Sequence, residues 1–179
     1  MIKKNNFMKK TFSMIVAAFM LFAVSTQAQT DKSKRPSPPA KVSETLKSGT
    51  IVSINYSQPS LKGRMIGSAD FVPYGQVWRT GANEATVFEV SKDVKVNGKT
   101  LPAGKYGLYT IPGGKEWTVI FNKTWNQWGT KYSQADDALR ITAKPEKKSD
   151  LMEKMTFKIE KDGDVSLLWG NTEVEFKVK

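Results

Sequence analysis

Short runs of alternating apolar and polar residues, separated by turn residues, fill the chain from Val42 onward. Alternation places every second side chain on one face of a strand, and helical periodicity is scarce in this part of the chain. The clearest turn is Asn97-Gly98, because both residues tolerate the positive φ angles that a two-residue hairpin loop requires. The pattern therefore predicts antiparallel hairpins.

The spacing of these runs predicts an all-β fold. The expected strands cover residues 50–57, 84–91, 94–96, 99–101, 106–111, 116–122, 138–143, 155–159, 165–169 and 174–178. Single helical turns are expected within 134–139 and 149–154, and a charged surface turn at 144–148. Many short strands separated by turns favour a single antiparallel β-sandwich, jelly-roll-like or a partly open barrel.

The N-terminal residues are typical of a secretory signal peptide. A lysine-rich start is followed by an apolar stretch at 14–24 and by small polar residues that place cleavage after Ala28. The apolar stretch is shorter than the roughly 20 residues that span a bilayer, so an uncleaved anchor is the less favoured alternative. We expect a signal peptide at 1–28, a Pro-rich tether at 29–40 and a β-sandwich domain at 41–179. The mature protein would be periplasmic, secreted or at the cell surface, without a transmembrane segment.

The composition restricts the chemistry. The chain contains no His and no Cys, which removes disulfides, imidazole bases and thiolate or imidazole zinc ligands. We therefore expect no cofactor and no metal, and an enzyme is disfavoured. Once four lysines leave with the signal peptide, 24 basic residues face 17 acidic ones, a mature net charge of +7. This excess is spread along the chain, so nucleic acid is not an expected partner.

Five ordered blocks resemble a known family. The longest is Val72-Pro73-Tyr74-Gly75-Gln76-Val77-Trp78-Arg79-Thr80-Gly81-Ala82-Asn83-Glu84-Ala85-Thr86. The others begin at Arg35, Tyr56, Leu101 and Trp117. Together, over roughly residues 35–179, they resemble the family called domain of unknown function 2911. The resemblance implies a β-rich domain exported by Bacteroidetes-type bacteria. It implies no activity and no catalytic residue.

The segment from Trp78 to Glu84 is the first candidate site. Trp78 can stack on a ligand, Arg79 can pair with a carboxylate or sulfate, and Asn83 and Glu84 can bind hydroxyls. In the structural alternative, Arg79 pairs with Glu84 inside the fold while Trp78 packs in the core. The sequence leaves both alternatives open.

Aromatic and basic residues elsewhere supply further candidates. Trp125 and Trp128, with amides between them, resemble a sugar-stacking platform, although a loop of this kind can also plug one end of the core. Arg64 can join Arg79 in an anion site or hold carbonyl groups in a turn. The pair Asp136-Asp137 lacks the alternating oxygen ligands of a Ca²⁺ loop.

Three functions follow, in order of preference. The first is a non-enzymatic binding module in the cell envelope, for a glycan, a peptide or a small anion. The second is a structural or adaptor protein of the envelope, with an envelope protein as its partner. The third is a glycoside hydrolase in which Glu84 is one of two catalytic carboxylates.

Overall fold

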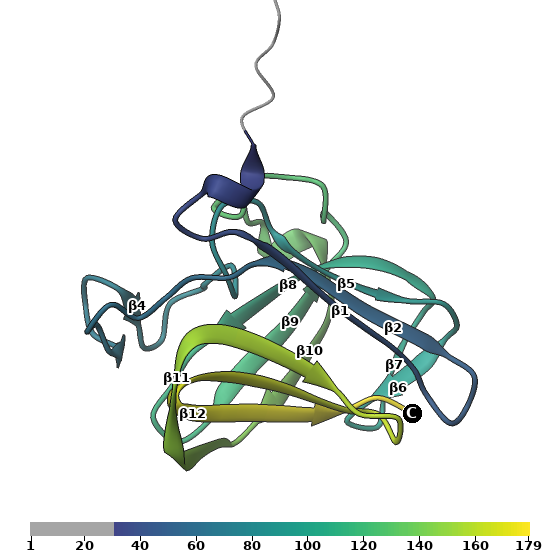
Figure 1. Cartoon of the computed structure of the whole chain (residues 1–179). Coiled ribbons are helices and arrows are strands. Elements are labelled where there is room, and N and C mark those ends of the chain that lie inside the picture. Colours follow the sequence, from purple (N-terminus) through teal and green to yellow (C-terminus); the bar gives the residue numbers. More distant parts are fainter. Residues whose placement is uncertain (1–30) are drawn as a thin grey trace, which may run out of the picture. The chain divides into compact units, whose positions relative to one another are not determined.

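Six antiparallel strands form the main sheet in the computed structural model, which describes residues 31–179 (Figure 1). In sheet order they are β1 (Pro39–Thr45), β2 (Ile51–Ser57), β5 (Thr86–Val90), β8 (Gly104–Ile111), β9 (Trp117–Asn122) and β10 (Asp137–Ala143). Apart from two short strand pairs inserted between them, neighbouring strands follow one another along the chain. The sheet is therefore a meander, in which each strand pairs with the one before it.

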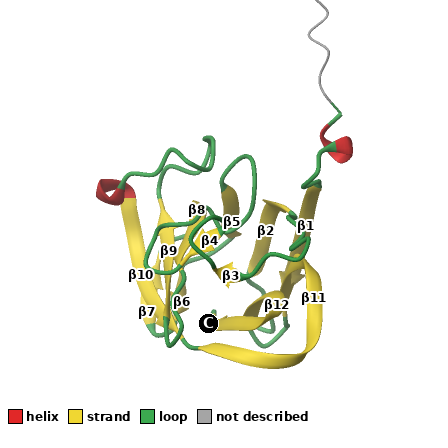
Figure 2. Ribbon diagram, turned by 90° about the vertical axis from the view of Figure 1, so that its left-hand side faces the viewer, coloured by secondary structure: helices red, strands yellow, loops and turns green. Residues whose placement is uncertain are grey.

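A long hairpin supplies the second layer. Strands β11 (Pro145–Ile159) and β12 (Asp164–Lys177) form a two-stranded sheet of their own, and they cross the open side of the curved main sheet (Figure 2). At its ends the hairpin approaches both edges of that sheet, because β11 contacts β1 and β12 contacts β10. The two layers do not close into a barrel. The prediction of an all-β, sandwich-like fold is confirmed.

Short elements complete the domain. Strands β3 (Ile66–Gly67) and β4 (Val72–Pro73) form a parallel pair, and β6 (Val94–Val96) and β7 (Lys99–Leu101) form a hairpin. The helical elements of the described part are two 3₁₀ turns, η1 (Lys32–Lys34) and η2 (Gln134–Asp136).

The turn between β6 and β7 has the expected conformation. Asn97 and Gly98 adopt φ angles of 46° and 83°, and Val96 pairs with Lys99 across the turn. Both values lie in the left-handed region that a two-residue hairpin loop requires. The predicted hairpin is therefore confirmed.

The core lies between the main sheet and the hairpin, and strand alternation decides which side chains enter it. On β2 and β5, Ile54 and Phe88 are fully buried, and they lie opposite each other in the strand register. Trp117 and Trp169 are each 2% exposed, which confirms that they are core residues. Burial of a large apolar side chain contributes roughly 1.5–3 kcal/mol. Packing of this kind holds the domain together, since the chain has no Cys for disulfides.

The region 144–154 differs from the prediction. The turn expected at 144–148 and the helical turn expected at 149–154 are wrong, because residues 145–154 belong to the continuous strand β11. The expected surface position of 144–148 is confirmed, since Lys144, Lys147 and Lys148 are exposed. Most side chains of residues 146–154 are exposed, so no apolar alternation marked this half of the strand. The pairing with β12 shifts register on either side of Met152, which further obscures a period of two. Similarly, the two strands expected at 165–169 and 174–178 are joined in the single strand β12, which ends at Lys177.

The expected N-terminal segments are a signal peptide and a tether. The signal peptide at 1–28 lies outside the described residues. Within the expected tether, Pro39 and Ala40 already pair with β2 as the first residues of β1. Along residues 31–179, no helix combines the length and the apolar character needed to cross a membrane.

Candidate functional site

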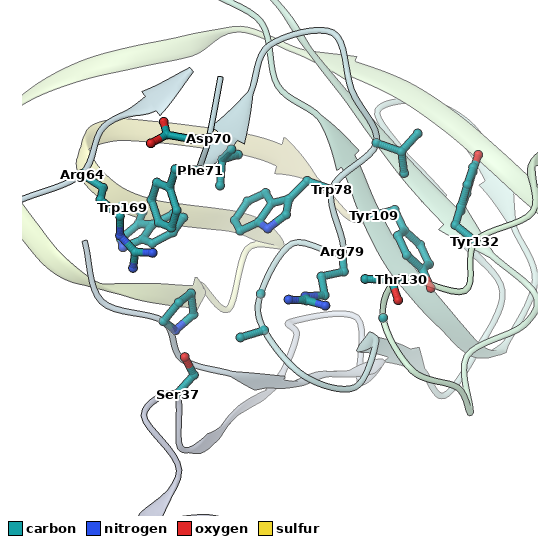
Figure 3. Close-up of a pocket in the computed structure, with 16 residues that line it drawn as sticks. Ser37, Arg64, Asp70, Phe71, Trp78, Arg79, Tyr109, Thr130, Tyr132 and Trp169 are labelled. Atoms are coloured by element: carbon teal, nitrogen blue, oxygen red, sulfur yellow. The ribbon is translucent and has the colours of Figure 1, made fainter. Parts of the chain in front are cut away.

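A cleft of about 650 Å³ lies beside the segment that begins at Trp78 (Figure 3). Five aromatic side chains and two guanidinium groups contribute to its wall. Its lining residues are Ser37, Pro59, Arg64, Asp70, Phe71, Val72, Val77, Trp78, Arg79, Gly81, Ala82, Tyr109, Gly129, Thr130, Tyr132 and Trp169. Of the predicted site residues, the cleft wall therefore brings together Trp78, Arg79 and Arg64.

Trp78 is held in place by backbone hydrogen bonds and by contacts of its ring. Its amide and carbonyl exchange hydrogen bonds of 2.7 and 2.9 Å with Thr110 of β8. The indole stacks on Trp169, with ring centroids 5.4 Å apart and planes 12° apart, and its edge meets Trp117 at 6.4 Å. The half-buried Trp78 thus joins the core on one side and lines the cleft on the other.

The backbone after Trp78 turns sharply. Thr80 and Asn83 have φ angles of 51° and 60°, a region that a β-branched residue such as Thr rarely adopts. Hydrogen bonds hold Thr80 there: its hydroxyl bonds to the Thr110 hydroxyl at 3.1 Å, and its carbonyl accepts the Thr86 hydroxyl at 2.8 Å. Such strain costs on the order of 1–3 kcal/mol and persists only where neighbouring contacts fix it. This fixed turn follows Arg79 directly in the chain.

Arg79 points into the cleft without a protein partner. Within residues 31–179 its guanidinium makes no hydrogen bond and no ion pair, although the residue is half-buried. Its aliphatic part lies against Gly129, where a Cβ would come 2.9 Å from the Arg79 Cβ. Burial raises the pKa of Tyr109, while a hydrogen bond from Gln127 and the charge of Arg79 act in the opposite direction. A fixed positive charge therefore stands at this end of the cleft.

Glu84 lies outside the cleft wall and does not pair with Arg79. Its carboxylate contacts Lys32 at 3.0 Å and accepts two hydrogen bonds from Arg35 at 2.9 and 3.0 Å. Partial burial raises the pKa of Glu84, but its backbone amide, Lys32 and Arg35 outweigh burial and lower the pKa to about 2. The group is thus ionised at neutral pH, which does not suit the general acid of a glycoside hydrolase.

Asn83 completes the attachment of the N-terminal segment. Its side-chain amide donates a hydrogen bond of 3.1 Å to the carbonyl of Ser37, a residue of the cleft wall. Asn83 and Glu84 therefore fasten the segment from Lys32 to Ser37 beside the cleft. They hold one wall in place and do not face the cavity.

The loop that carries Trp125 and Trp128 packs against the end of the segment that begins at Trp78. Ala85 donates a backbone hydrogen bond of 3.0 Å to Gln127, and Gly129 donates one of 3.0 Å to Asn83. The two candidate segments of the sequence are thus neighbours. Trp128, however, is 47% exposed and lies outside the cleft wall.

Trp125 also lies outside the cleft wall. The ammonium of Lys105 lies 5.2 Å from the centre of its ring, a cation–π contact at the protein surface. From this loop, Gly129 and Thr130 line the cleft instead of the two indoles.

Arg64 stands at the other end of the cleft. Its guanidinium donates hydrogen bonds of 2.9 Å to the carbonyls of Leu61 and Ser60, and it stacks 3.8 Å above the ring of Phe71. It therefore holds carbonyl groups in its turn, and it also lines the cleft.

A closed network supports the wall near Tyr132. The Tyr132 hydroxyl donates to Asp137 at 2.8 Å, and Arg140 bonds to both groups at 2.6 and 2.7 Å. Asn122 donates to the second oxygen of Asp137 at 2.9 Å. Asp137 is fully engaged by these groups, and the described chain contains no cluster of three or more acidic residues able to hold a metal ion.

Sequence reasoning missed several cleft residues. Phe71, Tyr109 and Tyr132 come from three separate segments. Tyr109 looks like an ordinary core position of an expected strand, whereas Phe71 and Tyr132 lie between expected strands, where no alternation marks them. Gly129 could have been found from the sequence, because it directly follows Trp128 in the loop of the predicted sugar-stacking platform. Its contact with Arg79, however, joins residues that are fifty positions apart in the sequence.

Comparison with known proteins identifies the family alone. No curated protein and no solved structure matches the chain at a significant level. The family model described as "Protein of unknown function (DUF2911)" matches residues 37–178, which confirms the resemblance noted in the sequence. This match covers most of the chain and the whole cleft wall. The chain is therefore a member of the DUF2911 family.

Proposed function

We propose that the chain is an exported, non-enzymatic binding module of the cell envelope, and that its cleft binds a small anionic ligand through Arg79. One observation carries the proposal: the Arg79 guanidinium is fixed in a cleft and has no partner among residues 31–179. A half-buried charge loses hydration, and without an ion pair it recovers little of that free energy. A carboxylate or sulfate bound to the guanidinium fork would restore two hydrogen bonds at once.

The size and wall of the cleft support a ligand of this kind. Its volume of about 650 Å³ lies within the range of roughly 300–1,000 Å³ typical of small-molecule pockets. Five aromatic side chains line the cleft together with charged and hydroxyl-bearing residues, so its wall can contact a ring and also bind polar groups.

Direct titration tests the proposal. The protein, purified after expression of the full chain, is titrated with benzoate, glucuronate and galactose sulfate by calorimetry. We expect at least one anion to bind, and Arg79→Gln to weaken that binding at least about tenfold, since a charge-assisted hydrogen bond contributes about 1.5–3 kcal/mol. The matched control is Lys95→Gln, which removes one positive charge from an exposed position of β6 outside the cleft wall.

If Arg79→Gln and Lys95→Gln weaken anion binding equally, the effect is general electrostatics and the cleft is not the site. Export is tested separately, by intact mass of the protein recovered from the cell envelope, which should begin at Gln29.

A further inference from the structure

A second guanidinium faces the cleft from the side opposite Arg79. Figure 3 shows Arg64 beside Phe71 and Trp169, Arg79 beside Thr130, and Trp78 between the two arginines. Arg64 uses two of its five N–H donors on the carbonyls of Leu61 and Ser60, which leaves 5 − 2 = 3 donors. It is therefore held in place and still able to bind an anion.

The wall between the two guanidiniums is aromatic. The Trp78 ring stacks on the buried Trp169 ring at 5.4 Å, and the Phe71 ring meets Trp169 at 5.1 Å, so Trp169 holds the Trp78 and Phe71 rings rigidly in the cleft wall. Rigid aromatic surfaces of this kind suit a ring with apolar C–H faces, because they bury apolar area without losing side-chain freedom.

Polar side chains that can form hydrogen bonds with ligand hydroxyl groups also line the cleft. Asp70 lines the cleft, and within residues 31–179 its carboxylate makes no hydrogen bond and no ion pair. The hydroxyl groups of Ser37 and Thr130 line the cleft as well. A carboxylate accepts hydrogen bonds only, so Asp70 suits a ligand that also carries hydroxyl donors. A purely anionic ligand would be repelled by it.

We infer that the ligand of this cleft is an acidic saccharide with two anionic groups. One carboxylate or sulfate pairs with Arg79, a second pairs with Arg64, and a sugar ring lies against Trp78 between them. The cleft volume of about 650 Å³ accommodates a ligand of roughly drug size, such as a disaccharide. This inference rests on the proposed function, since it gives the anion at Arg79 a chemical class.

Calorimetric titration with a graded set of disaccharides tests the inference. The set comprises neutral N-acetyllactosamine, a glucuronate–N-acetylgalactosamine disaccharide, its O-sulfated form, and digalacturonate. We expect the two doubly anionic compounds to bind tightest and the neutral one weakest. Comparison of these two compounds shows whether the cleft prefers a sulfate or a carboxylate as the second anionic group.

The Arg64→Gln variant assigns the second anionic group. Glutamine keeps an amide donor for the turn and removes the charge. We expect this variant to weaken the doubly anionic compounds about tenfold and the singly anionic one less than about twofold. The matched control, Lys62→Gln, removes a charge from the same turn at an exposed position outside the cleft wall, and it should leave both affinities unchanged.

Two outcomes would overturn the inference. The first is equal weakening of singly and doubly anionic disaccharides by Arg64→Gln, which would mean that Arg64 acts only on the fold. The second is Arg79-dependent binding of benzoate together with no binding of any disaccharide. That second outcome would leave the proposed function standing, whereas binding of no anion at all would remove both.

Discussion

The side chain of Arg79 lies directly against the Cα of Gly129, so that any side chain at position 129 would overlap it. A Cβ at residue 129 would lie 2.9 Å from the Arg79 Cβ and closer still to its Cδ. The same Cβ would lie 2.9 Å from the carbonyl oxygen of Asn83, which belongs to the backbone and cannot easily move. The loop glycine therefore fixes the position of the charge in the cleft.

Substitution of Gly129 should disturb that charge. We expect Gly129→Ala to displace the Arg79 side chain, to weaken anion binding and to lower the free energy of unfolding by about 1–3 kcal/mol through overpacking. Gly114→Ala is the matched control, because the new Cβ would meet only the Tyr74 ring at 3.8 Å, an ordinary contact. Urea unfolding and calorimetry of both variants check the prediction. Equal losses in the two variants would show that Gly129 has no special relation to Arg79.

The ion pairs of Glu84 should make stability depend on pH. The pKa of Glu84 is about 2 in the folded protein, below its ordinary value of 4.5. Its contribution to stability is therefore fully present above pH 4.5 and is lost as the pH falls from there through 2. Because the carboxylate is 41% exposed, solvent screening limits this contribution to about 1 kcal/mol or less.

A matched pair of variants isolates this effect. We expect Glu84→Gln to unfold more easily than the unmodified protein at pH 7, with the difference shrinking toward pH 2. Glu116→Gln removes an exposed carboxylate that makes no ion pair within residues 31–179, and it should show no such trend. Urea unfolding across the pH range measures both. A constant difference for Glu84→Gln at all pH values would contradict the assignment of these ion pairs.

The two tryptophans of the candidate segments should differ in their effect on stability. Trp78 stacks on Trp169, so Trp78→Ala leaves a cavity beside the core and should cost about 3–5 kcal/mol. Trp128 is 47% exposed, so Trp128→Ala should cost less than about 1 kcal/mol. Denaturant unfolding of the two variants gives the comparison. A loss at Trp128 as large as that at Trp78 would show that the loop indole carries core packing.

Much of the fold is predictable because strand alternation reports burial. Phe88 and Val90 of β5 and Trp117 and Val119 of β9 are buried at the expected positions, since every second residue of a half-buried strand must face the core. Prediction fails where a strand has no buried face. The exposed half of β11, around Lys147 to Lys154, has no apolar period to reveal that it is a strand.

The candidate site is less predictable, because it depends on contacts between distant segments. The sequence indicates Trp78, Arg79 and Arg64 as residues of interest, and all three line one cleft. The sequence does not show that Glu84 pairs with Lys32 and Arg35. These two residues lie in the expected tether, about fifty positions before Glu84. Local sequence patterns predict local structure, whereas the partner of a charged residue depends on which distant segments the fold brings together.

Nuclear magnetic resonance of the arginine side chains tests whether the Arg79 guanidinium binds the anion. The chain contains four arginines, so their Nε–H signals can be resolved and assigned with the Arg79→Gln variant. On addition of glucuronate, we expect a large shift of the Arg79 signal and none of the Arg140 signal, because Arg140 is already bonded to Asp137 and Tyr132. Binding of glucuronate without a shift at Arg79 would contradict the claim that this guanidinium is the anion site.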